Sequence, residues 1–560
     1  MFDESAIHRL LHPAGDTFDP EAQLLRSSNG THDLCWNARY ASYVIVLKQE
    51  AYYLRARQIL QRLLTLQDTD PDSPTFGLWS YTLEESLREM GFPDFNVADF
   101  VAKTFLDILY RNPQVLPEAE KEALIPGLRR AIECSIRRNI APDYTNISII
   151  SAMTILSAGE LLGDERYFAI GKARLRKLVD YTRFNTGFTE YNSSDYALLD
   201  IEEISRMLDF FKDPEARELA ETLNFYAWDM LTSHFNLSIG QLSPPQSRAY
   251  IDLEQGRIQA LLYLGTGGKF GKIESLQAVA PPWLIVGLCC PERCMEHLRR
   301  REQWIDHRFY RRNDLISPEE ETAIVLSRNS PDLYARTYHT DQYSMGSFSF
   351  SDLWKQRRTC MLLWGKDKPC YLRLRGLRNG QDFCSAVSCA SQYKNVILGY
   401  VGFVTDRGSG HYIIDQNKCG PYETSRLGFR FELGGHPEMV TVTQQGNVFL
   451  YDASGLRIRL TVWAWIYDGK PGQLRFDAHS GCVELVCFDG AARAFSPKDL
   501  GKTYGIFTIA VDPDPDPLPV IREESGKVEA ALSTAQALLR VTGSTLPIPF
   551  DDAAELSASG

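Results

Sequence analysis

The stretch YFAIGKARLRKLVDYTRFNTGFTEYNSSDYALLDIEEISRMLDFF spans residues 167–211 and contains two amphipathic segments separated by a polar connection. Residues 167–184 and 197–211 place apolar side chains at i, i+3, i+4 and i+7, which predicts two helices. The connection between them, residues 185–196, is rich in hydrogen-bonding and titratable groups. It is either an ordinary solvated loop or part of the wall of a polar site, and the sequence leaves both interpretations open.

The helical pattern of this stretch continues over roughly residues 32–300. The same apolar spacing recurs in residues 34–49, 51–67, 96–111, 117–138, 146–163, 164–182 and 213–235. Short connections alternate with long polar ones, which is typical of antiparallel helical hairpins stacked side by side. We therefore expect a first domain over residues 1–300, built as an incomplete α/α toroid whose long loops gather on one face.

After about residue 305 the sequence changes to short segments rich in β-branched and aromatic residues, separated by Gly, Asp, Asn and Pro. Examples are residues 322–328, 370–377, 411–416 and 456–468. We expect an antiparallel β-sandwich over residues 301–525, which makes the chain a multidomain α+β protein. In the last part, residues 526–560, we expect one terminal helix, formed by the stretch of residues 523–541, and a disordered tail after residue 545.

Bulk properties narrow the function classes. A chain of 560 residues implies two or three domains, and its net charge of −12 argues against a general nucleic-acid binder. An anionic ligand stays possible, because a few local arginines override the global sign. No apolar run reaches the ~18 residues of a membrane span, and the N-terminus lacks the features of a secretory signal. We expect a cytoplasmic protein with no membrane partner, unless a signal has been removed; the oligomeric state is left open.

Metal and cofactor sites are not indicated. The 12 cysteines are scattered, and the densest group, CCPERC at residues 289–294, lacks paired C-x2-C spacing and a nearby histidine pair. Buried free thiols are the better interpretation. We therefore predict no metal and no cofactor.

The long polar connections hold the candidate binding residues. Residues 77–100 contain Trp79, Tyr81 and Asn96 among several acids. Aromatic rings stack on the C–H faces of sugars while amides and acids bind hydroxyls, so this composition suits a carbohydrate surface. Helix capping and a solvated acidic turn explain the same residues without a ligand.

Other connections hold candidates for chemistry. Asn146 stands at a predicted helix start, where it is either an N-cap or a site residue. Arg248 follows Gln246 and precedes Tyr250; its fixed fork of donors suits a carboxylate, although a surface ion pair is the simpler alternative. His339 lies between two predicted strands, either exposed in a turn or reaching from the sandwich into an interface site.

The segments WSYTLEE, PDFNVADF, YTNISII, GFTEYNSSDY and SRAY, together with the order of toroid and sandwich, resemble the heparinase II/III-like and alginate-lyase-like polysaccharide lyases over roughly residues 30–500. This resemblance implies β-elimination on a uronic-acid-containing poly- or oligosaccharide. In such a reaction the carboxylate beside the acidic C5 proton must be neutralised as charge develops toward an enediolate. A tyrosine or histidine then moves the proton.

The resemblance also implies roles for individual residues. Asn146 and Arg248 would neutralise the substrate carboxylate, Tyr191 and Tyr250 would act as acid and base, and His339 would be a base or a substrate contact from the sandwich. The implied substrate-binding residues are Trp79, Tyr81, Asn96, Glu190, Asn192 and Gln246.

Two departures from the family pattern affect the mechanism. Related segments often read NSPTY and GPHSR, whereas this chain has NSSDY and PPQSR. Gln246 therefore stands where a histidine is expected, and a glutamine cannot act as a general base near neutral pH. The chain either uses Tyr250 instead or has lost the activity.

Two other function classes compete with elimination. A glycoside hydrolase needs two carboxylates ~5–10 Å apart, and the polar connections supply Glu84, Glu85, Asp94, Asp99 and Glu190. A non-catalytic glycan-binding protein is the third possibility. A lyase leaves an unsaturated uronate that absorbs in the near ultraviolet, whereas a hydrolase adds water and leaves none. The sugar, its linkage and the choice between endo and exo action are left open.

Overall fold

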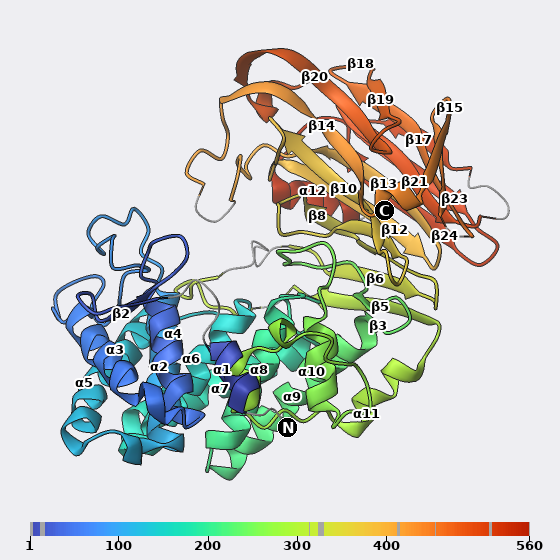
Figure 1. Cartoon of the computed structure of the whole chain (residues 1–560). Helices are drawn as coiled ribbons and strands as arrows, with labels where there is room; N and C mark the ends of the chain where they lie inside the picture. Colours follow the sequence, from blue (N-terminus) through green and yellow to red (C-terminus); the bar gives the residue numbers. More distant parts are fainter. Residues whose placement is uncertain are drawn as a thin grey trace.

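The computed structural model describes residues 4–11, 17–312, 314–322, 330–411, 415–453, 455–513 and 518–558. Within these ranges the long helices come first and the large sheets follow (Figure 1). The predicted fold class, an α/α toroid of helical hairpins followed by a large antiparallel β-sandwich, is confirmed.

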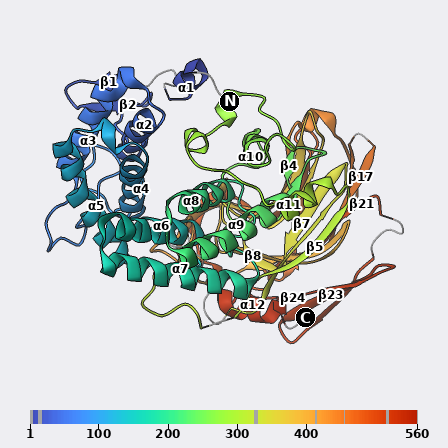
Figure 2. The ribbon, with the colours of Figure 1, turned by 90° about the horizontal axis from the view of Figure 1, so that it is seen from below.

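The helical region consists of α1 (Glu4–Leu11), α2 (Leu34–Val46), α3 (Tyr53–Leu66), α4 (Asn96–Arg111), α5 (Glu118–Arg138), α6 (Thr145–Leu162), α7 (Glu165–Asn185), α8 (Tyr196–Phe210), α9 (Pro214–His234), α10 (Arg257–Gly265) and the short α11 (Glu292–Met295). Helices α2, α4, α6 and α8 contact one another in succession, and each packs against its hairpin partner, α3, α5, α7 or α9. The result is an inner and an outer row of helices curved into an open ring (Figure 2).

The inner helix α6 is buried on all sides from Thr145 to Gly159. Its length and mean hydropathy of 1.3 match those of a membrane-spanning helix, but 83% of it is buried inside the protein, and the core helix of a soluble protein passes the same test. Close contact with α7 requires glycine at the crossing. A Cβ on Gly159 would lie 2.4 Å from the main-chain nitrogen of Phe168.

Buried ion pairs fix the inner helices against each other. Arg206 of α8 donates to Asp107 of α4 at 3.0 Å and to Glu203 at 2.5 Å, and Lys103 of α4 also donates to Glu203. Charges taken out of water are costly unless they are paired. These partners therefore hold α4 and α8 in one relative position.

The sandwich has two large antiparallel sheets within the described ranges. One is nine-stranded, in the order β19 (Gln473–Asp477), β20 (Cys482–Phe495), β14 (Tyr422–Gly435), β10 (Cys370–Arg378), β9 (Cys360–Trp364), β7 (Tyr343–Phe348), β6 (Leu333–His339) and β5 (Gln303–Tyr310), with β11 (Gln381–Asp382) beside β10. The other is eight-stranded, in the order β15 (Thr441–Gln445), β16 (Val448–Ala453), β17 (Leu456–Tyr467), β21 (Tyr504–Val511), β13 (Val396–Phe403), β12 (Ala386–Tyr393) and β8 (Phe350–Asp352), with β18 (Lys470–Pro471) beside β17. Apolar side chains of both sheets, such as Leu372, Phe431 and Phe507, form the core between them.

Some strands of the structure lie outside the segments predicted from the sequence. Strands β5 and β12 were not predicted, and neither were the small pairs β1 (Thr17–Asp19) with β2 (Leu24–Arg26) and β3 (Phe235–Asn236) with β4 (Gln241–Leu242). Most of the strand expected over residues 322–328, and the middle of the one expected over 411–416, lie outside the described residues.

The prediction of a terminal helix over residues 523–541 is wrong. This part of the chain forms a third antiparallel sheet of β22 (Val520–Glu524), β23 (Lys527–Ser533) and β24 (Leu538–Ser544). Burial alternates along β23, which is the period of a strand. Ser525 and Gly526 both have positive φ and form a tight two-residue turn of the kind that closes hairpins. The expected disordered tail is also wrong, because α12 (Phe550–Ala558) follows.

The two regions meet where the loop of residues 239–253 covers the outer face of the nine-stranded sheet. Ile239 and Leu253 of this loop pack against Leu363 and Tyr371 of strands β9 and β10. This contact places the long polar connections of the toroid beside the segment that links β8 to β9.

Candidate functional site

The Glu190 carboxylate is the centre of a buried polar network at this junction. The main-chain nitrogen and Nδ2 of Asn146 donate to Glu190 Oε2 at 2.9 and 2.6 Å, and Arg248 Nη1 donates to Oε1 at 2.8 Å. Asn146 lies in the first turn of α6, where the helix dipole favours an anion. Asn146 and Arg248 thus meet around a carboxylate, but it belongs to the chain itself and not to a substrate.

From Arg248 the network runs outward to solvent. Arg248 Nε donates to Gln356 Oε1 at 3.1 Å, and Nη2 donates to Tyr196 Oη at 3.0 Å. Tyr196 Oη lies 2.8 Å from Tyr250 Oη. Tyr250 is 56% exposed, whereas Glu190 is fully buried. A continuous line of hydrogen bonds therefore connects a buried ion pair to a phenol at the surface.

The sandwich contributes an imidazole to the same place. The Arg248 guanidinium carbon lies 5.6 Å from the centre of the Trp354 ring, and the His411 ring meets the Trp354 ring edge-on at 4.8 Å. Burial, assisted by the positive charges of Arg248 and Lys355, lowers the pKa of His411 below its ordinary value. His411 is therefore neutral at pH 7 and has the protonation state of a general base.

Tyr191 points away from this network into the interior. It is fully buried, and its Oη lies 2.6 Å from His234 Nε2. His234 Nδ1 is 2.8 Å from the main-chain oxygen of Met230. Because a carbonyl only accepts, Nδ1 carries the proton and Nε2 accepts from the Tyr191 hydroxyl. The His307 ring stacks on Tyr191 at 5.2 Å.

His339 belongs to the same buried group. Its Nδ1 lies 3.1 Å from Ser243 Oγ, so it does reach from the sandwich to a loop of the helical region, but in the interior. Burial lowers the pKa of His234 to about 3 and the pKa values of His307 and His339 to about 4. All three imidazoles are neutral at physiological pH.

These three histidines predict acid-sensitive stability. In the unfolded chain they titrate near pH 6.5 and in the folded chain near pH 4 or below, so in this window the unfolded state binds more protons. The contribution of these histidines to the free energy of unfolding is fully present above pH 6.5. It falls as the pH decreases toward 4, by about 1.4 kcal/mol per pH unit for each histidine. Urea unfolding measured across this range checks the slope.

The matched variant for this experiment is His307→Gln. It removes one titrating group and is expected to reduce the slope by about a third, since three histidines contribute. His479→Gln, at an exposed position, serves as the control and should leave the slope unchanged. Equal slopes in the wild type and in His307→Gln would contradict the assignment.

Two other predicted residues shape the loop that carries Arg248. Asn192 has a φ of +51°, and its Nδ2 donates to the main-chain oxygens of Ser243 and Pro245 at 2.7 and 2.9 Å. The main chain of Gln246 pairs with that of Arg358, with N···O distances of 3.2 and 2.9 Å. Both residues hold this loop against its neighbours.

The residues expected on the first polar connection are spread out. Trp79 is buried in the helical core, and its indole nitrogen donates to a main-chain oxygen of α3. Tyr81 is 40% exposed on the same connection. Asn96 Nδ2 donates to Tyr144 Oη at 3.3 Å, and the Tyr144 ring lies 6.0 Å from the Arg248 guanidinium carbon. Asn96 therefore adjoins the network, whereas Trp79 does not.

Sequence reasoning missed Tyr196, Gln356 and His411. Tyr196 stands in the polar connection, five residues after the tyrosine that was chosen, and opens helix α8. His411 lies in a segment expected to be an ordinary strand, and nothing local distinguishes it. Within the ranges that the structure describes, no three His, Cys, Asp or Glu side chains are grouped closely enough to hold a metal ion.

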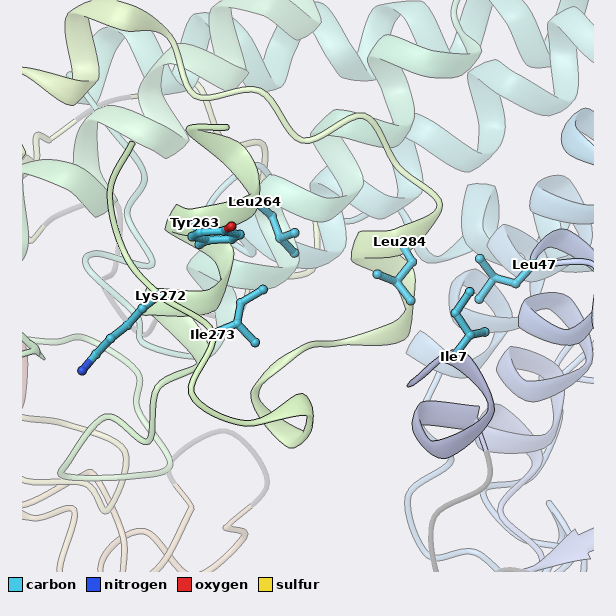
Figure 3. A pocket seen from close by; sticks show the side chains of 7 residues that line it. All are labelled: Ile7, Leu47, Tyr263, Leu264, Lys272, Ile273 and Leu284. Atoms are coloured by element: carbon cyan, nitrogen blue, oxygen red, sulfur yellow. The ribbon is translucent and has the colours of Figure 1, made fainter. Parts of the chain in front are cut away.

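A cavity of about 670 Å3 lies between α1 and the region around α10 (Figure 3). Its lining residues are Ile7, Leu47, Tyr263, Leu264, Lys272, Ile273 and Leu284. The amine of Lys272 points away from the other side chains in Figure 3 and is paired with Glu274. This mainly apolar lining offers no carboxylate or imidazole for work on a sugar.

An α/α toroid joined to an antiparallel sandwich, with phenols, a guanidinium and a neutral imidazole at their junction, defines a toroid–sandwich protein with a candidate acid–base site. A family model described as Domain of unknown function (DUF8769) matches residues 5–276, and no curated protein matches the chain.

Solved structures with a similar shape include heparinase III, with a TM-score of 0.42 and 10% identity over 91% of this chain and 82% of that chain. Another is a sugar epimerase from a ruminal bacterium, with a TM-score of 0.32 and 12% identity over 53% of this chain and 84% of that chain. A similar fold does not by itself establish a function.

Proposed function

We propose that the protein is a carbohydrate-active enzyme, a lyase that cleaves a uronic-acid-containing poly- or oligosaccharide by β-elimination. The observation that carries this proposal is the line of hydrogen bonds from Arg248 through Tyr196 to the exposed Tyr250, with the neutral His411 in edge-on contact with the Trp354 ring beside Arg248. A base and an acid that work on the same sugar need this combination of protonation states.

In the proposed reaction His411 removes the C5 proton of the uronate. The electrons of the C5–H bond form the C4–C5 double bond, the C4–O bond breaks, and the leaving glycosidic oxygen takes a proton from Tyr250. Tyr196, in hydrogen-bond contact with Tyr250, returns a proton to it, and the Arg248 cation stabilises the negative charge that passes through the two phenols. His411 then loses its extra proton to water, and Tyr196 regains a proton from water.

The network favours elimination over hydrolysis. A retaining or inverting hydrolase needs two carboxyl groups facing the glycosidic bond. Both oxygens of Glu190 are bound, one by Arg248 and the other by Asn146, and the side chain is fully buried. A carboxylate held in this way supports the position of Arg248 and does not act as a nucleophile or an acid.

The deciding experiment is a screen on uronate oligosaccharides followed by near-ultraviolet absorbance and mass spectrometry. The proposal expects an unsaturated product without added water. Products that carry one added water and no absorbance would establish a hydrolase instead.

On a substrate found in this way, His411→Gln is expected to lower kcat by about 10²–10⁴, since it removes the base but leaves the ring position filled. His479→Gln is the matched control, in the exposed turn between β19 and β20, and should retain full activity. Full activity in His411→Gln would exclude this histidine as the base.

A further inference from the structure

Beside the acid–base network, two arginines share a single carboxylate. Arg358 Nε lies 2.6 Å from Asp252 Oδ1, and Arg373 Nη1 donates to the same oxygen at 2.9 Å. Both arginines are almost completely buried. Their other contacts, made by Arg358 Nη1 and Arg373 Nη2, are main-chain oxygens of the turn that links β8 to β9. Carbonyl oxygens satisfy hydrogen-bond donors, but they do not cancel a charge.

The two guanidinium groups are therefore under-compensated. Within the part of the chain that the structure describes, Nε of Arg373 has no acceptor, and Nε of Arg358, although close to Asp252, is out of line for a hydrogen bond. Burial, with the adjacent Arg373 cation as the next cause, lowers the pKa of Arg358 to about 10. A buried cation that is short of negative charge binds an anion when one can reach it.

Arg375, on the same strand as Arg373, is an example of a fully compensated guanidinium group. Arg375 donates to Asp382 at 2.8–2.9 Å and to Glu432 at 2.7 Å, so one guanidinium meets two carboxylates. At Arg358 and Arg373 the ratio is reversed, since two guanidinium groups meet one carboxylate.

The buried arginine pair has a partly exposed rim and adjoins the candidate site. The Asp252 side chain is 25% exposed, and Lys355, whose main-chain oxygen accepts from both arginines, is exposed and adds a third positive charge. Lys355 also acts on the pKa of His411. The loop that carries Arg248 pairs with the same turn, because the main chain of Gln246 bonds to that of Arg358.

We infer that Arg358 and Arg373, around Asp252, form an anion-binding subsite that takes a carboxylate or sulfate group of the ligand. Asp252 occupies part of the site when the ligand is absent, and the ligand's anion supplies the second negative charge. The assignment of this anion to an acidic glycan rests on the proposed function; the anion site itself does not. In this arrangement the two arginines neutralise the negative charge of the substrate in place of Asn146, whose amide is bound to Glu190.

The test is anion binding without turnover, measured by isothermal titration calorimetry at constant ionic strength. The probes are glucuronate, inorganic sulfate and, as the uncharged control, glucose. The wild type is expected to bind glucuronate or sulfate and not glucose. A preference for glucuronate identifies a carboxylate, and a preference for sulfate identifies a sulfate ester.

Variants separate a binding role from a structural one. Arg373→Gln and Arg358→Gln are expected to weaken anion binding about tenfold or more, whereas Arg375→Gln, at the compensated position, should leave it unchanged. Asp252→Asn removes the internal competitor and is expected to tighten anion binding about tenfold, an outcome that lost structure would not produce. Arg373→Lys keeps a charge and should retain part of the affinity if Arg373→Gln fails to fold.

The inference is overturned if the wild type binds neither anion, if glucose binds as well as glucuronate does, or if Asp252→Asn leaves the affinity unchanged. Because no turnover is measured, loss of the lyase proposal would leave a positive binding result intact. Equally, a functional lyase whose Arg373→Gln variant binds glucuronate normally would overturn the subsite alone.

Discussion

Replacing Tyr196 by phenylalanine is expected to lower kcat by about 10²–10⁴ while changing the free energy of unfolding by only about 1 kcal/mol. The hydroxyl of Tyr196 accepts from Arg248 and contacts Tyr250 at the surface end of the network. Its loss interrupts proton return to Tyr250 and separates the guanidinium from the phenol whose charge it stabilises. The aromatic ring stays, so the packing around it is conserved.

Tyr191→Phe is the informative comparison, because the resemblance to polysaccharide lyases implied a catalytic role for Tyr191. Its buried hydroxyl donates to His234 Nε2, and a phenylalanine would leave that nitrogen without a donor. We expect a loss of about 1–3 kcal/mol in the free energy of unfolding and a kcat close to that of the wild type. Turnover assays and urea unfolding of both variants decide between the two tyrosines.

The opposite pattern of activities would place the catalytic acid or base elsewhere in the protein. If Tyr191→Phe abolishes turnover and Tyr196→Phe does not, the acid or base lies in the buried histidine group, and the surface network is a structural feature. Tyr263→Phe, on α10 and partly exposed, is the control that should affect neither quantity.

The fold was largely predictable because its signals are local. Helices such as α7 and α9 repeat their apolar positions every three to four residues, start at Asp164 and Asp213, and need no distant partner to be recognised. The exception, residues 523–541, has a composition rich in Ala, Leu and Glu that favours a helix. The turn at Ser525 and Gly526 and the pairing with β24 decide otherwise, and pairing is not visible in local composition.

The site was less predictable, because the polar connection has no period. Consecutive residues turn to different partners: Glu190 to the start of α6, Tyr191 to the buried His234, and Asn192, with positive φ, to another loop. The sequence identified the connection as polar and left open whether it is a solvated loop or part of a site. Which of its two tyrosines joins the network that reaches the surface is set by packing between segments that are far apart in the chain.

Glu190→Gln is expected to lower the free energy of unfolding by about 3–5 kcal/mol, because it leaves the Arg248 cation buried without its carboxylate. The first turn of α6 also loses the anion that accepts from Asn146. A glutamine keeps the size and one acceptor oxygen, so the loss reports mainly on charge. Calorimetric or urea unfolding provides the measurement.

A double-mutant cycle separates this pair from general damage. Arg248→Met in the Glu190→Gln background removes the uncompensated cation and is expected to restore part of the lost stability, since an apolar replacement of a buried pair is often tolerated. Glu215→Gln, which breaks an ion pair with Arg176 between two exposed side chains, should have a much smaller effect. If Glu190→Gln costs no more than Glu215→Gln, then Glu190 is not the counter-ion that holds Arg248 in place, and the positioning of Tyr196 by that arginine loses its physical basis.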